Sequence, residues 1–129
     1  MSLAQLNPIA FIPITNFEVA REFYETTLGL TCLGDDGFAL IFRVGPHNQM
    51  LRLALIDPNF KPAPFTIFGW EVDNIHETVG ELTDKGVEFL HFNAMQQTPD
   101  GVWKTPGGGA VAWFKDLDGN TLSLSHHPA

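Results

Sequence analysis

The stretch IAFIPITN (residues 9–16) has the same pattern of residues as the later stretch IFGWEVDN (residues 67–74). Each stretch is an apolar run of strand length that ends in asparagine, a residue suited to capping a helix. Each leads into an amphipathic segment that stops at a glycine, Gly29 in the first copy and Gly86 in the second. Strand-like residues then resume. A strand–helix–strand unit that recurs after about 58 positions predicts a duplicated architecture.

The rest of each copy adds three strands. The predicted strands after the helices are residues 30–33, 38–44 and 50–56 in the first copy, and 87–91, 110–115 and 121–125 in the second. The order is therefore β-α-β-β-β twice. We expect one domain, residues 1–129, with module 1 at about 6–57, a proline-rich linker at about 58–64 and module 2 at about 65–127.

Composition and charge exclude several classes of protein. Hydrophobic residues make up 44% of the chain and charged residues 17%, which is typical of a globular protein and not of a disordered one. No apolar run has the length of a membrane span, and we expect no leader segment. Seven basic residues against fifteen acidic ones give a net charge of −8, which argues against nucleic acid as a partner. The acidity would either attract a cationic ligand or simply form a solvated surface.

The single cysteine, Cys32, cannot form an internal disulfide. Disulfide-free chains are typical of reducing compartments. We therefore expect a cytoplasmic protein.

Two further stretches are similar to a known superfamily. FIPITN (residues 11–16) leads to Phe23-Tyr24 and then LGL (residues 28–30), and AWFKDLDGN (residues 112–120) leads to LSL (residues 122–124). In this order they resemble the glyoxalase/bleomycin-resistance/extradiol-dioxygenase superfamily, the vicinal oxygen chelate proteins, over essentially the whole chain. The resemblance implies an α+β fold in which two βαβββ modules form curved sheets around a shared cavity. It also implies a homodimer as the expected assembly, with modules paired within one chain or across two.

Strand alternation sorts the side chains into two faces. The side expected to pack under the helices holds Ala10, Ile12, Ile14, Leu51, Leu53, Leu55, Phe68, Trp70, Val72, Ala112, Phe114, Leu122 and Leu124. The side expected to face the cavity holds Ile9, Phe11, Pro13, Arg52, Ala54, Ile56, Ile67, Gly69, Glu71, Val111, Trp113, Thr121, Ser123 and Ser125.

The sequence departs from the family pattern at the positions of the metal ligands. Metal-using members place His, Gln or Glu ligands at positions that here hold Ile9, Arg52, Ile67 and Ser123. These residues supply no carboxylate or imidazole donor, and an arginine repels a cation. We therefore expect no metal and no cofactor, which argues against glyoxalase, extradiol-dioxygenase and metal-dependent fosfomycin-transferase activity.

Arg52 and Glu71 are the main polar candidates for ligand binding and catalysis. An arginine in an apolar cavity would bind a carboxylate or phosphate of a ligand. The alternatives are an ion pair with Glu71 or a side chain that reaches solvent. Glu71 would serve as a general base if burial raised its pKa, but a solvated carboxylate at a strand end is the simpler interpretation.

The remaining candidates are aromatic and aliphatic. Phe11, Phe65 and Trp113 would form an aromatic ligand-binding pocket, or else pack as ordinary core. Ile9, Ile67 and Gly69 would complete its wall, and Ser123 would contribute a hydroxyl. None of the five histidines has a metal-ligand spacing. His127 would contribute only if the C-terminal end folded over the cavity, and a frayed end is the alternative.

Three loop stretches have sequences that could form a binding site. Gly107-Gly108-Gly109 precedes a predicted strand and not a helix, so it is not a phosphate loop. Asp116-x-Asp118-Gly119 lacks the later ligands of a calcium loop and is read as a hairpin turn. Residues 93–109 form a long segment with glycine and proline, which indicates a lid, a binding loop or a mobile connection.

Two functions are consistent with these features. The first is a protein that binds a small organic molecule such as an antibiotic in a metal-free cavity, as bleomycin-resistance proteins do. The second is a metal-independent lyase or isomerase that uses Arg52 to stabilise an oxyanion and Glu71 as the base. The sequence favours binding but does not identify the ligand.

Overall fold

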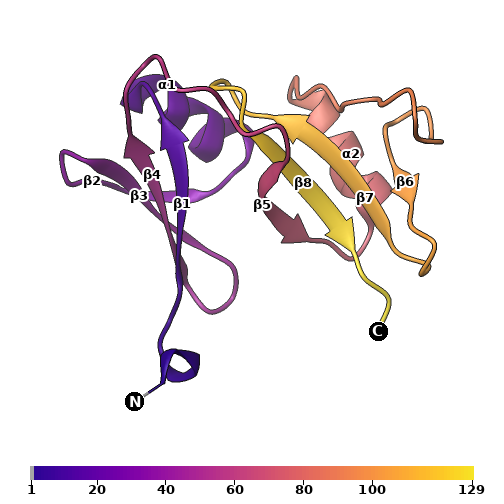
Figure 1. Ribbon diagram of the computed structural model, residues 1–129, viewed down its shortest axis with the longest axis horizontal. Coiled ribbons are helices and arrows are strands. Elements are labelled where there is room, and N and C mark those ends of the chain that lie inside the picture. Colours follow the sequence, from indigo (N-terminus) through magenta and orange to yellow (C-terminus); the bar gives the residue numbers. More distant parts are fainter. Residues whose placement is uncertain (1) are drawn as a thin grey trace. The chain divides into compact units, whose positions relative to one another are not determined.

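The computed structural model describes residues 2–129 and divides them into two compact units, one ending at Phe60 and the next beginning at Lys61. The division lies inside the proline-rich segment expected to be the linker. Each unit holds one four-stranded sheet with a helical segment on one of its faces (Figure 1). These two βαβββ-like units confirm the predicted α+β fold class.

The first unit has the strand order β1-β4-β3-β2. After the short 3-10 helix η1 (Leu3–Gln5), its elements are β1 (Ile9–Ile14), α1 (Phe17–Arg21), the π-helix η2 (Glu22–Thr27), β2 (Thr31–Asp35), β3 (Ala39–Val44) and β4 (Gln49–Leu55). β1 runs parallel to β4, and β4 runs antiparallel to β3.

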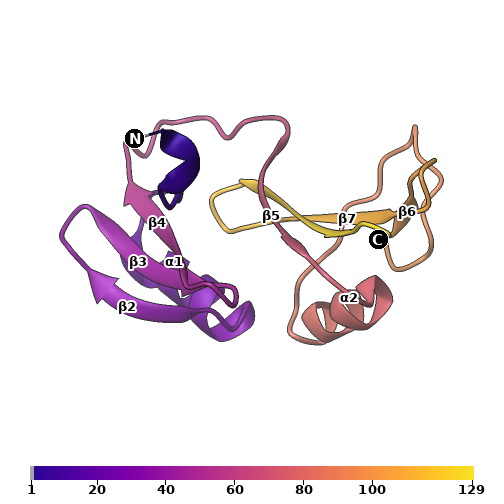
Figure 2. The same cartoon turned by 90° about the horizontal axis from the view of Figure 1, so that it is seen from below.

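The second unit repeats this arrangement with the order β5-β8-β7-β6. Its elements are β5 (Thr66–Glu71), α2 (Ile75–Asp84), β6 (Trp103–Lys104), β7 (Ala110–Lys115) and β8 (Thr121–His126). β8 lies between β5, its parallel neighbour, and β7, its antiparallel one. Figure 2 shows α2 on one side of this sheet, which leaves the other side uncovered by any helix of its unit.

The helix signals of the sequence are confirmed. The side chain of Asn16 accepts a hydrogen bond from the Val19 N–H at 3.0 Å, and that of Asn74 accepts one from the Glu77 N–H at 3.2 Å. Gly29 and Gly86 both have positive φ, at 79° and 96°, where glycine ends a helix without strain. The first helix departs from prediction in one respect, because its second half widens into the π-helix η2.

The predicted inward faces form the cores. Ile12, Ile14, Leu51 and Leu53 are fully buried in the first unit, as are Ala112, Phe114 and Leu122 in the second. The leucine row ends early, since Leu55 at the end of β4 is largely exposed. Strand alternation therefore placed most of the core correctly, although Phe68 and Trp70 are only half-buried and Ser123, expected on the cavity side, is buried.

The edge of the second sheet corrects the sequence analysis. The predicted strand at residues 87–91 is an isolated bridge, in which Phe89 pairs with Phe114. The edge strand is instead β6, which pairs with the other end of β7 and lies inside the segment predicted to be irregular. Two short pieces of chain thus share the edge that one strand was expected to occupy.

The hairpin between β7 and β8 is held by a buried carboxylate. Asp116 accepts hydrogen bonds from the backbone N–H groups of Asp118 and Asn120 at 3.0 and 2.9 Å, and from the Asn120 side-chain amide at 2.8 Å. This confirms the turn and not the calcium loop, because the oxygens of Asp116 accept bonds from the chain itself.

Replacing Asp116 with alanine is expected to lower the free energy of unfolding by about 2 kcal/mol, because buried N–H donors lose a charged acceptor. Urea unfolding measures the change. The control is Glu88→Ala, which removes an exposed carboxylate of the same unit and is expected to stay within about 0.5 kcal/mol of the parent. Equal losses in both variants would contradict the structural role of Asp116.

Candidate functional site

The uncovered face of the second sheet carries a row of side chains that strand pairing fixes. Trp113 on β7 lies opposite Ser123 on β8, and Ser123 lies beside Gly69 on β5. Two residues further along, Lys115 lies opposite Thr121, and Thr121 lies beside Thr66. Paired residues share a face of the sheet, so this row points away from α2.

A bulge in β5 changes which residue reaches this face. The register shifts between Thr66, which pairs with Thr121, and Phe68, which pairs with Leu122. Ile67 is the extra residue between them, and strict alternation had placed it on the cavity side. Because of the bulge, Thr66 takes the place on the open face that alternation gave to Ile67.

Gly69 allows β5 and the Ser123 side chain to approach closely. A Cβ at residue 69 would lie 2.4 Å from Ser123 Oγ and 2.8 Å from the Ser123 carbonyl oxygen. Both distances are shorter than real Cβ contacts. The hydroxyl of Ser123, a buried residue, therefore occupies the space that a side chain at position 69 would need.

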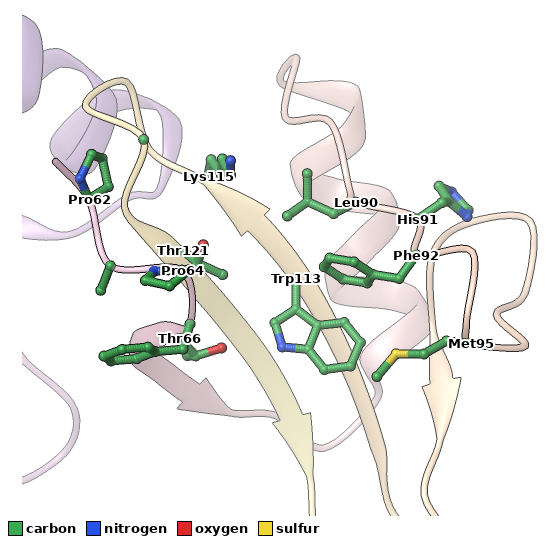
Figure 3. A pocket seen from close by; sticks show the side chains of 13 residues that line it. Pro62, Pro64, Thr66, Leu90, His91, Phe92, Met95, Trp113, Lys115 and Thr121 are labelled. Carbon is green, nitrogen blue, oxygen red and sulfur yellow. The ribbon is translucent and has the colours of Figure 1, made fainter.

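The same face is hollowed beside Trp113, with a volume of about 750 Å³ (Figure 3). Apolar side chains from three stretches make up most of its wall. The lining residues are Pro62, Ala63, Pro64, Phe65, Thr66, Leu90, His91, Phe92, Met95, Trp113, Lys115, Gly119 and Thr121. A hollow of this volume has the size of sites that bind drug-sized molecules.

Aromatic rings dominate the hollow. Phe92 meets Trp113 edge to face, with ring centroids 5.4 Å apart and an interplanar angle of 87°. The ring of Trp103 on β6 packs against the ring of Trp113, with the two centroids 6.2 Å apart. Phe65 and Phe92 are 65% and 41% exposed, although burying such rings is strongly favourable. These rings present an apolar surface that a planar molecule could cover.

The wall that carries Phe92 is fixed by Gln97. Its side-chain oxygen accepts a hydrogen bond from the Phe92 N–H at 2.7 Å, and its amide donates to the carbonyls of Leu90 and Gly101, each at 2.9 Å. Within residues 93–109, Gly101 and Val102 are buried. The part of this segment around Gly101 is therefore packed against its neighbours, whereas residues 93–94 and 106–108 are exposed.

The hollow brings together only some of the predicted site residues. Phe65 and Trp113, two of the three rings expected to form an aromatic pocket, line it. Ser123 lies opposite Trp113 and Gly69 lies beside Ser123 on the next strand, but neither lines the hollow, and Ile67 lies in the bulge. Sequence reasoning missed Leu90, Phe92 and Met95, whose signal was only their apolar character beside an irregular segment.

Ile9, Phe11 and Arg52, which were also predicted site residues, belong to the first unit. Ile9 and Phe11 on β1 are 47% and 59% exposed, and Phe11 lies beside Arg52 in the sheet. Arg52 is bound within its own unit, because its Nη2 donates to Asp36 Oδ2 at 2.7 Å. This partner differs from Glu71, the partner considered from the sequence.

Glu71 also has a partner that the sequence did not single out. Its Oε2 accepts a hydrogen bond from the His127 backbone N–H at 2.7 Å, and its Oε1 is bonded to Nδ1 of the same residue. These bonds lower the pKa of Glu71 from its ordinary value. A general base would need the raised pKa that the sequence analysis considered, so the structure corrects that premise. They also tie down the C-terminal end, which was expected to fray.

The four residues that the sequence resemblance assigns to metal-ligand positions supply no suitable donor set. Ile9 and Ile67 offer no donor, Arg52 is cationic and paired with Asp36, and the Ser123 hydroxyl is packed over Gly69. A divalent ion of this family needs imidazole or carboxylate ligands. Elsewhere among residues 2–129, no three His, Cys, Asp or Glu side chains gather as a metal ion would require.

Arg52→Met is expected to raise the pKa of Asp36 from about 2 toward its ordinary value. The hydrogen bond from Arg52 lowers this pKa most, and the Phe38 and Ala39 N–H groups, each at 3.0 Å, lower it further. The rise is therefore partial. Because the folded-state pKa lies below the value of about 3.9 in unfolded chains, the pair stabilises the protein above about pH 4. That contribution is lost as the pH falls through about 2.

Carboxyl NMR titration of Asp36 measures the change. Arg43→Met is the matched control, since Arg43 bonds the Asn48 carbonyl and no carboxylate. An unchanged Asp36 pKa in Arg52→Met would show that the ion pair does not form in solution.

Several solved structures have the same fold as this chain. No protein-family model matches the sequence, and no curated protein matches it. Similar solved structures include a Bacillus anthracis protein assigned to the glyoxalase family, 21% identical over 96% of both chains with a TM-score of 0.72. TnmS3, an antibiotic binding protein from Streptomyces sp. CB03234, is 21% identical over 95% of both chains with a TM-score of 0.68.

A third structure is a glyoxalase/bleomycin resistance protein/dioxygenase from Alicyclobacillus acidocaldarius. It is 16% identical, with a TM-score of 0.68, over 100% of this chain and 96% of its own. At these identities the likeness establishes the fold. No helix among residues 2–129 is long and apolar enough to cross a membrane. The resemblance seen in the sequence is thus confirmed in three dimensions, and the chain has the fold of the glyoxalase/bleomycin-resistance/dioxygenase superfamily.

Proposed function

We propose that this protein binds a small organic molecule with a planar aromatic body in the hollow beside Trp113, without a metal ion. The observation that carries the proposal is the edge-to-face pair of Phe92 and Trp113, which opens onto a space of about 750 Å³ with Phe65 exposed in its wall. An aromatic ligand would gain stacked or edge-to-face contacts with these exposed rings.

Two further facts support binding. TnmS3, a protein of the same fold, is described as an antibiotic binding protein. The positions at which the family holds its metal carry Ile9, Arg52, Ile67 and Ser123, which supply no suitable donors. A binding protein needs shape and apolar surface, and the hollow provides both.

The alternative, a lyase or isomerase that uses Arg52 and Glu71, has less support. Arg52 is paired with Asp36, and the bonds to His127 lower the pKa of Glu71. Neither residue lines the hollow. An enzyme built on this pair would have to release both residues from their present partners.

NMR titration tests the proposal through the indole N–H signals of the three tryptophans. A naphthalene alcohol is expected to shift the Trp113 signal and, more weakly, the signal of Trp103, and to leave that of Trp70 on the opposite face unchanged. A saturated ring alcohol of similar size is the control and should bind more weakly. Equal shifts from both compounds, or none from either, would refute an aromatic-binding site.

The homodimer implied by the resemblance stays a prediction. Light scattering of the purified protein would measure it directly. The exposed Ile9 and Phe11 on the first sheet are consistent with a covered surface in such an assembly.

A further inference from the structure

Charge is distributed unevenly between the hollow and the rest of the protein. The chain carries fifteen acidic residues and a net charge of −8, yet no Asp or Glu is among the residues that line the hollow. The only ionisable side chains in its wall are Lys115 and His91. The site is thus locally cationic in an acidic protein, which runs against a preference for cationic ligands.

Lys115 is the cation placed to meet a ligand. It ends β7 two residues after Trp113, so both side chains point to the open face of the sheet. Figure 3 shows Lys115 at one end of the hollow, beyond Trp113 and near Thr121. Within residues 2–129 no salt bridge joins Lys115 to a carboxylate.

His91 contributes less to the interior. In Figure 3 its ring lies beyond Phe92 and is turned away from Trp113. Its Nε2 lies near the buried Gly101, 3.8 Å from the position that a Cβ on that residue would occupy. The positive charge that faces the space above Trp113 therefore comes from Lys115.

Hydroxyl groups accompany Lys115. Thr121 lies directly opposite it on β8, and Thr66 lies beside Thr121 on β5, so one row of the sheet holds an ammonium and two hydroxyls. Such a row can donate several hydrogen bonds to one oxyanion. Lys115 is exposed, so salt is expected to screen its attraction for an anion.

We propose that the hollow selects aromatic molecules that carry an anionic group, a carboxylate, sulfonate or phosphate, which Lys115 holds with Thr66 and Thr121 while the ring lies against Trp113 and Phe92. This selectivity rests on the proposed function, since it assumes that an aromatic body binds here. It assigns a specific role to a lysine that the sequence did not single out.

Three probes that share one ring system test the selectivity. They are naphthalene sulfonate, naphthalene methanol and naphthylmethylammonium, each titrated at low salt and pH 7 while the Trp113 indole signal is followed. We expect the sulfonate to bind about tenfold more tightly than the alcohol and the ammonium to bind most weakly. The advantage of the sulfonate should shrink as salt is added.

Lys115→Met should bring the affinity for the sulfonate down to the affinity that the same variant has for the alcohol. Lys104→Met is the matched control, because Lys104 is an exposed lysine of the same sheet that does not line the hollow. It changes the net charge equally and should preserve the preference.

The outcomes separate the two proposals. Equal binding of sulfonate and alcohol by the parent protein, or a preference that survives Lys115→Met, would overturn the anion selectivity and leave aromatic binding intact. Failure of all three probes to shift the Trp113 signal would remove the proposed function and this selectivity together.

Discussion

Trp113→Ala is expected to weaken the binding of naphthalene methanol by roughly 30-fold or more, the effect of removing a central aromatic contact. Trp113 lines the hollow and is the ring on which both Phe92 and Trp103 pack. Its loss would remove one face of the site and free Phe92 to turn. Affinity is measured by titration followed through backbone amide signals near residue 113.

The control for this variant is Phe38→Ala. Phe38 is 78% exposed and is not among the residues that line the hollow, so this variant removes a surface aromatic side chain outside the site. Its affinity for the probe should match that of the parent. Circular dichroism must show that Trp113→Ala remains folded. A folded Trp113→Ala protein with unchanged affinity would place the binding site elsewhere.

Gly69→Ala is expected to lower the free energy of unfolding by about 3 kcal/mol, the upper part of the range for overpacking. The added methyl group would lie 2.4 Å from Ser123 Oγ and 2.8 Å from the Ser123 carbonyl oxygen. The hydroxyl can rotate, but the carbonyl belongs to the backbone of β8 and moves only with the strand. Urea unfolding measures the loss.

Gly80→Ala provides a matched control with the opposite sign. Gly80 lies inside α2, and an added Cβ there meets nothing within 4 Å. The same substitution should raise the free energy of unfolding by up to about 1 kcal/mol, because alanine favours the helix over glycine. In the Gly69→Ala background, Ser123→Gly should recover part of the loss. Stabilisation at both glycines would show that β5 and the Ser123 side chain are not so close.

Local signals in the sequence predicted the fold well. Asn16 and Asn74 cap their helices through hydrogen bonds to residues three positions ahead. Contacts of this kind can be predicted from the sequence because both partners lie in one short stretch. The buried rows of Leu51 with Leu53 and of Leu122 with Leu124 followed from alternation alone.

Features that depend on pairing between strands far apart in the sequence could not be predicted. The bulge at Ile67 exists because β5 must fit the register of β8, more than fifty residues away along the chain. The bond between Arg52 and Asp36 likewise depends on how the turn before β3 folds against β4. The apolar wall at residues 90–95 is held by Gln97, whose three hydrogen bonds leave no pattern in the sequence.

The position of β8 has a consequence for how the protein emerges from the ribosome. The first sheet is complete once Leu55 has been synthesised, whereas the second lacks its central strand until His126 has been added. At roughly 5–20 residues per second, that interval lasts about 4–14 seconds. Within that interval β5 exposes an unpaired edge from the synthesis of Glu71 onward, and β7 does so from the synthesis of Lys115 onward, until β8 is made and joins both.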